Sequence, residues 1–80
     1  MDSIKEKAKD LTLMLLYLTS WEERGIDAPR SWKSYDFGIM DELIDDGFIY
    51  GSRKAKSVYI DESGVLRAKA LLAKYGINVE

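Results

Sequence analysis

The sequence predicts a small, mainly helical α+β domain, and three observations support this prediction. Apolar residues recur at helical spacing in three stretches, and glycines follow those stretches. Two short runs of β-branched and aromatic residues, at 48–50 and 57–60, have the composition of strands. The chain has 80 residues, which is the size of one domain. We therefore expect a single domain over residues 1–80.

The first helix is predicted to be long. Ser3 and Glu6 have the spacing of a capping box, and the polar run at 22–25 ends in Gly25, which can close a helix. Apolar residues lie on nearly every side of this helix. One face carries Ile4, Ala8, Leu11, Leu15 and Leu18, and the other faces carry Leu13, Met14, Leu16, Tyr17 and Trp21. Such a helix either threads the centre of the domain or exposes a surface to a partner.

The apolar breadth of the first and last helices indicates self-association. A two-fold dimer is the commonest soluble oligomer, so we expect a homodimer. The candidate interface residues are Leu13, Leu16, Tyr17, Trp21 and Leu71. The alternative is a monomer in which both helices wrap one core.

A loop and a short second helix are predicted next. Residues 26–34 include Pro29, the single proline, together with polar residues, and predict a loop with at most one helical turn. Asp36 is a candidate N-cap for a helix that runs to about Asp46, and Gly47 would end it.

A β-hairpin and a last helix complete the predicted order. The runs at 48–50 and 57–60 are joined by a basic, glycine-containing turn at 51–56. Two strands alone are only marginally stable, so the hairpin must pack on the helices. Asp61 is a second candidate N-cap, and Gly76 would close the last helix.

This order of elements resembles two kinds of protein. The stretch from Met40 to Leu72 is similar to the recognition helix, wing and final helix of winged helix-turn-helix transcription regulators. A closer resemblance covers nearly the whole chain and is to a small bacterial domain family of unknown function. Its residues are Leu11–Thr19, Trp32-Lys33, Tyr35-Asp36, Leu43–Ile49, Lys54–Val58 and Glu62-x-Gly64. This resemblance implies a bacterial or phage origin and a winged-helix-like fold, and it brings no catalytic residues.

Composition excludes many functions. The chain has no cysteine and no histidine, so it lacks a disulfide, a thiolate nucleophile and the commonest general base and metal ligand. We expect no catalysis, no metal, no cofactor and no small-molecule substrate. The N-terminus is charged, unlike a signal peptide, and the longest apolar run, 11–18, is far shorter than the ~20 residues of a membrane span. We therefore expect a cytoplasmic protein that makes no use of a membrane.

The basic hairpin turn is the candidate nucleic-acid site. Residues 51–80 hold six basic and three acidic residues, whereas residues 1–50 hold six basic and eleven acidic residues. Cations at the turn can neutralise phosphates of double-stranded DNA without reading sequence. The candidate residues are Arg53, Lys54 and Lys56, with Arg30 and Lys33 added. The alternative is a solvated turn whose charges discourage edge pairing.

The second helix argues against base reading. Asp41, Glu42, Asp45 and Asp46 are predicted to cover its outer side, where a groove-reading helix presents basic or amide side chains. These carboxylates are one turn apart in pairs, a spacing also seen at cation sites, although a solubilising helix face is the simpler interpretation.

Aromatic residues offer a further hypothesis. Trp32, Tyr35, Tyr50 and Tyr59 either stack nucleobases beside Lys33 or pack in the core. Two functions follow from the sequence. The domain is either a DNA-associated regulatory module that contacts the backbone through its basic wing, or a protein-interaction and dimerisation module that does not read DNA.

Overall fold

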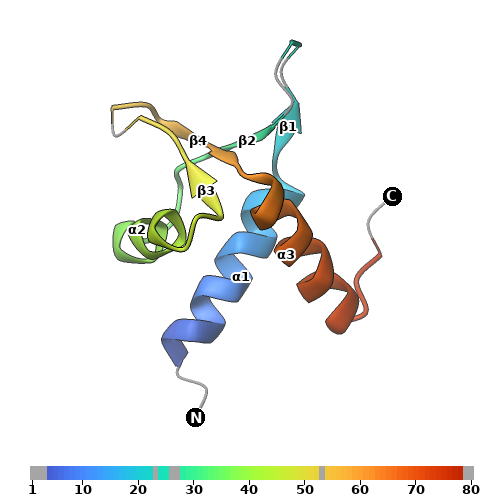
Figure 1. The fold of residues 1–80 in the computed structure, drawn as a ribbon. Coiled ribbons are helices and arrows are strands. Elements are labelled where there is room, and N and C mark those ends of the chain that lie inside the picture. Colours follow the sequence, from blue (N-terminus) through green and yellow to red (C-terminus); the bar gives the residue numbers. More distant parts are fainter. Residues whose placement is uncertain (1–3, 23, 26–27, 53, 79–80) are drawn as a thin grey trace.

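The computed structural model of the chain describes residues 4–22, 24–25, 28–52 and 54–78. These residues form three helices and a four-stranded antiparallel sheet. The elements in chain order are α1 (Ile4–Leu18), β1 (Trp21–Glu22), β2 (Pro29–Trp32), α2 (Phe37–Asp45), β3 (Ile49–Tyr50), β4 (Ser57–Ile60) and α3 (Glu62–Lys74). The strand order is β1-β2-β4-β3, and the helices lie on one side of the sheet (Figure 1). The predicted α+β class is therefore confirmed.

The predicted hairpin is one half of this larger sheet. β3 and β4 pair antiparallel, with Ile49 opposite Ile60. β4 pairs on its other side with β2, where Ser31 lies opposite Val58. The loop predicted for 26–34 is therefore wrong over 29–32. Pro29 is the first residue of its strand, a position that tolerates the missing backbone N–H.

α1 ends at Leu18, earlier than predicted. The hydroxyls of Thr19 and Ser20 donate to carbonyl oxygens of the last helical turn at 2.7 and 2.6 Å, which satisfies acceptors that the helix leaves open. The chain can then turn so that Trp21 begins β1. Ser3, the predicted start of the capping box, lies outside the described residues.

α1 lies between α2 and α3 and threads the centre of the fold (Figure 1). The core-facing side of α1 carries Leu13 and Leu16, which are 1% and 0% exposed. The face that carries Leu11, Leu15 and Leu18 points outward, since these residues are 54%, 44% and 44% exposed. Periodicity could not choose between the two faces because both are apolar.

The core explains where the predicted interface residues lie. Leu13, Leu16 and Leu71 are buried within one chain, so they do not form an exposed surface, and this part of the interface prediction is corrected. Tyr17 is half-buried against the core, and Trp21 is half-buried on the sheet. Dimer formation itself stays a prediction.

The caps of α2 and α3 are confirmed. A carboxylate oxygen of Asp36 accepts the Ile39 N–H at 3.1 Å, and a carboxylate oxygen of Asp61 accepts the Ser63 N–H at 3.0 Å. The hydrogen bonds from Ser63 lower the pKa of Asp61 below its ordinary 3.8. Gly47 has φ of 82° and turns the chain from α2 towards β3, as a glycine after a helix does.

Candidate functional site

A groove separates α2 from the β3–β4 hairpin and the end of β2. Its volume is about 890 Å³. Apolar side chains provide much of its lining, and charged side chains lie on both walls. The lining residues are Trp32, Lys33, Ser34, Phe37, Met40, Asp41, Ile44, Asp45, Gly51, Ala55, Lys56 and Val58. We call this feature the α2 groove.

The α2 groove has an apolar floor and exposed apolar rims. Phe37, Met40 and Ile44 recur at helical spacing along one side of α2, which places them in one row. Met40 and Val58 are buried at the floor. Phe37 on the α2 rim is 74% exposed, and Trp32 on the opposite rim is 57% exposed. Large apolar side chains therefore border the opening without covering it.

The two walls of the α2 groove differ in charge. Asp41 and Asp45 lie on the α2 wall, and Lys33 and Lys56 lie on the wall formed by the strands. The Lys33 ammonium also donates to the carbonyl oxygen of Ser52 at 2.9 Å, which connects the end of β2 to the hairpin turn. A ligand that fits this groove would present complementary charges on its two sides.

The other two carboxylates of α2 pair with α1, which corrects the expectation of four outward acids. Lys9 contacts Asp46 at 2.7 Å and Glu42 at 3.6 Å, and Lys5 also pairs with Glu42. The hydrogen bond to Asp46 raises the pKa of Lys9 above its ordinary 10.5. The outward charge of α2 is therefore reduced to Asp41 and Asp45, beside two lysines.

The predicted nucleic-acid residues do not form one cluster. Lys33 and Lys56 line the α2 groove, and Lys54 is exposed on the hairpin turn. Arg30 lies on the opposite side of the sheet, where its Nε donates to the Ser57 hydroxyl at 2.5 Å. Arg53 lies outside the described residues. The cations thus serve two separate surfaces.

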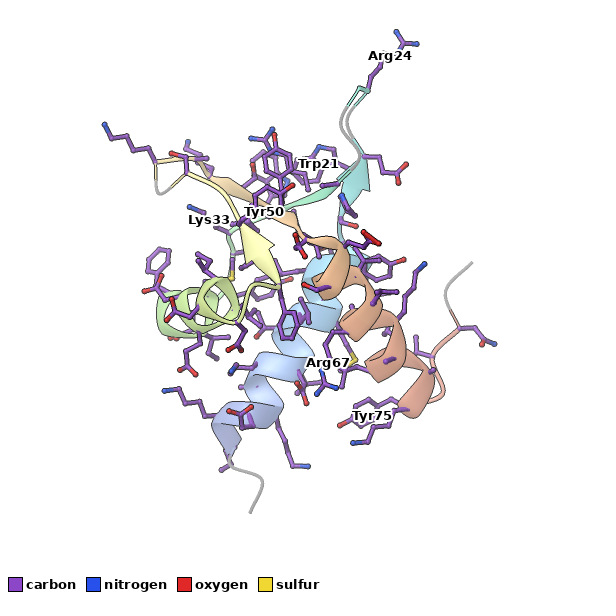
Figure 2. The ribbon with its side chains drawn as sticks, viewed as in Figure 1. Trp21, Arg24, Lys33, Tyr50, Arg67 and Tyr75 are labelled. Carbon is purple, nitrogen blue, oxygen red and sulfur yellow. The ribbon has the colours of Figure 1, made fainter. Side chains whose placement is uncertain are left out.

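The second surface is the side of the sheet that faces away from the helices, which we call the outer sheet face. Three cross-strand pairs link one residue from each strand. Trp21 of β1 lies opposite Arg30 of β2, and Arg30 lies opposite Tyr59 of β4. Tyr59 in turn lies opposite Tyr50 of β3. Residues in register share a face, so these side chains form a row across all four strands. Trp32 and Ser57 share this face. Figure 2 shows Trp21 and Tyr50 on the strands, with the helices on the opposite side.

Several functions have no support in the geometry. Among the described residues, no three His, Cys, Asp or Glu side chains are grouped closely enough to hold a metal ion. No helix in the described ranges is both long and apolar enough to cross a bilayer. The α2 groove and the outer sheet face offer apolar contacts, aromatic stacking and charged groups, all of which can contribute to binding a ligand.

Comparison with known families identifies the chain. The sequence model of a family described as a domain of unknown function (DUF6429) matches residues 4–78. The chain belongs to the DUF6429 family. This agrees with the resemblance to a small family of unknown function. Comparisons with curated proteins and with solved structures find no match.

Sequence reasoning missed part of each surface of this DUF6429 domain. The sequence places Trp21 in a predicted helix and Arg30 in a predicted loop, so it does not reveal that both align with the tyrosines of the hairpin. The Pro29–Trp32 segment has too short and too polar a pattern to indicate a strand by itself. Of the aromatic residues proposed for stacking, Tyr35 instead packs against the core.

Proposed function

We propose that this domain is a non-catalytic binding module that holds a segment of another protein in the α2 groove. The observation that carries the proposal is the uncovered apolar opening, with Phe37 and Trp32 on its rims. Exposed apolar patches with polar borders are typical of protein interaction sites. Buried aromatic anchors at their centre usually supply most of the binding energy.

The partner that fits best is an amphipathic helix. A helix laid in a groove inserts apolar residues spaced at i, i+3 or i+4, and i+7, which suits an apolar floor between two walls. We expect its basic side chains to face Asp41 and Asp45, and its acidic side chains to face Lys33 and Lys56. Such charge pairs set orientation and selectivity more than affinity.

The composition of α2 supports protein binding over base reading. Its sequence, FGIMDELID, contains no Arg, Lys, Asn or Gln, which are the side chains that most often read base edges in the major groove. Its groove side presents Phe37 and Ile44 instead. These residues would have to be buried against a partner to contribute binding energy.

Selection of peptides displayed on phage against the folded chain tests this proposal. We expect the selected peptides to be amphipathic and to bind a Phe37→Asp variant at least about 10-fold more weakly, since a charge would replace an apolar anchor. Leu66→Asp is the matched control, because Leu66 is a 63% exposed apolar residue on α3. Equal losses in the two variants, or a selection that yields no binder, would refute the assignment.

A second candidate function is contact with the backbone of double-stranded DNA in a winged-helix manner. Its support is topological, since α2 leads into β3 and the strands β2, β4 and β3 are neighbours in that order, as in a three-stranded winged-helix sheet. The exposed Lys54 and Lys56 on the hairpin turn would contact phosphates. Binding to random duplex should then fall steeply with salt and be abolished by reversing the charges of Arg53 and Lys54. Lack of duplex binding at low salt would remove this candidate.

A further inference from the structure

We propose that the outer sheet face stacks unpaired bases of single-stranded nucleic acid. This surface shares Trp32 with the rim of the α2 groove but lies on the other side of the sheet from α2, and the inference does not depend on the function proposed for that groove. It rests on the arrangement of aromatic rings, on the charges of the strands and on the span of the row.

The aromatic rings of this face form two pairs. The ring centroids of Trp21 on β1 and Trp32 on β2 are 4.9 Å apart, and those of Tyr50 on β3 and Tyr59 on β4 are 5.4 Å apart. Trp32 is 57% exposed and Tyr50 is 46% exposed, so each pair has one member that is open to solvent. A flat, exposed ring stacks on any base, because every base has a π-face.

Arg30 lies between the two pairs. Its guanidinium carbon is 4.9 Å from the centroid of Tyr59, and its Nη1 donates to the Tyr59 hydroxyl at 3.2 Å. The hydrogen bond to Ser57 fixes the side chain further. A guanidinium plane held in this way extends the stacking surface from the tyrosine pair towards the tryptophan pair.

The charges of the strands favour an anionic ligand. Glu22 is the one acidic residue within the four described strands, and alternation places it on the opposite side from Trp21. Arg24 follows β1 in the β1–β2 connection, and Figure 2 shows it projecting beyond the sheet. Lys54 is exposed in the β3–β4 connection. Arg30 within the row and Lys54 in the connection that follows Tyr50 are therefore the cations that would contact phosphates.

The row has the span of a short single strand. Three spacings between neighbouring strands, at ~4.8 Å each, place Trp21 roughly 14 Å from Tyr50. Four-stranded sheets that bind single-stranded RNA stack two or three bases on aromatic residues over a comparable open face. Duplex DNA does not fit this chemistry, because its base faces are already stacked within the helix.

Binding of short oligothymidylate and oligouridylate to the full chain tests the inference. At about 50 mM salt, where phosphate contacts are strong, we expect binding and quenching of tryptophan emission. Trp32→Leu and Tyr50→Leu, measured by the anisotropy of an end-labelled oligonucleotide, should each weaken binding by about 5- to 100-fold through loss of one stacking ring. Trp32→Phe keeps a ring and should retain most of the affinity.

The matched control is Tyr75→Leu. Tyr75 is 50% exposed but lies on the far end of α3 from the sheet, as Figure 2 shows, so its loss should leave binding unchanged. Circular dichroism identifies any variant that fails to fold. If Trp32→Leu does not fold, Tyr50→Leu, which lies on the short edge strand β3, tests the same inference. Failure of the wild-type chain to bind either oligonucleotide would overturn the inference. So would equal affinity for a duplex of the same length, or binding that neither ring removal weakens.

Discussion

The inner and outer sides of the sheet differ in how far their side chains are exposed to solvent. The inner side carries Ser31, Ile49, Val58 and Ile60, and each of these is at most 1% exposed. On the outer sheet face, Trp32 and Tyr50 are about half exposed, at 57% and 46%. Since side chains alternate along a strand, the same short segments supply both sets.

This difference separates the residues that stabilise the fold from those available for binding. The inner residues contact α1, α2 and α3 and contribute burial free energy to folding. The outer residues contact mainly each other, in cross-strand pairs that stabilise a sheet only modestly. Large aromatic side chains therefore remain partly exposed on a surface that contributes less to folding than the inner side does.

The largest effect is expected from shortening an inner side chain. Ile60→Ala removes buried methyl groups from a residue that is 0% exposed, and it should lower the free energy of unfolding by about 2–5 kcal/mol. Domains of this size have little stability in reserve, so partial unfolding at room temperature is expected. Urea denaturation followed by circular dichroism measures the change. A cost below about 1 kcal/mol would show that the inner side does not form the core in solution.

Much of this fold could be predicted from local signals in the sequence. The caps at Asp36 and Asp61 and the glycine turn at Gly47 were predicted because each depends on a few adjacent residues. β1 and β2 were missed because two-residue and proline-containing strands carry little signal of their own. They are strands because β2 forms backbone hydrogen bonds with β4, which is distant in sequence, and β1 in turn pairs with β2.

The candidate surfaces were predictable only in part. The aromatic and basic residues were identified as types, but their grouping depends on pairing between residues far apart, such as Arg30 with Tyr59. The neutralisation of Glu42 and Asp46 depends on how α1 crosses α2, which places Lys9 beside both. Neither arrangement leaves a pattern within a single segment of the sequence.

A smaller effect is expected where α3 approaches the inner side of the sheet. Gly64 in the first turn of α3 lies against the Phe48 carbonyl oxygen and the Ile60 side chain, with no room for a Cβ. Gly64→Ala should therefore displace α3 from the sheet and cost about 1–3 kcal/mol, despite the better helix propensity of alanine. Gly38→Ala in α2 is the control, because its Cβ would meet only the Asp36 carboxylate and should cost less. Thermal unfolding compares the two variants, and equal stability would mean that α3 packs less closely than the structure shows.

The smallest change in unfolding free energy is expected on the outer sheet face, and it gives the most direct comparison with the inner side. Tyr50→Leu keeps an apolar side chain on β3 but removes the stacked pair with Tyr59, so the cost in unfolding free energy should be about 0.5–1.5 kcal/mol at most. Ile60→Ala, measured in the same denaturant series, supplies the reference for a buried position. If Tyr50→Leu proved as costly as Ile60→Ala, the outer aromatics would be part of the folding core, and the division of the sheet into a structural side and a binding side would be wrong. If Tyr50→Leu lowers the free energy of unfolding only slightly but weakens oligonucleotide binding strongly, the Tyr50 ring acts in ligand binding. The reason is that an aromatic ring can stack on a base and a leucine side chain cannot.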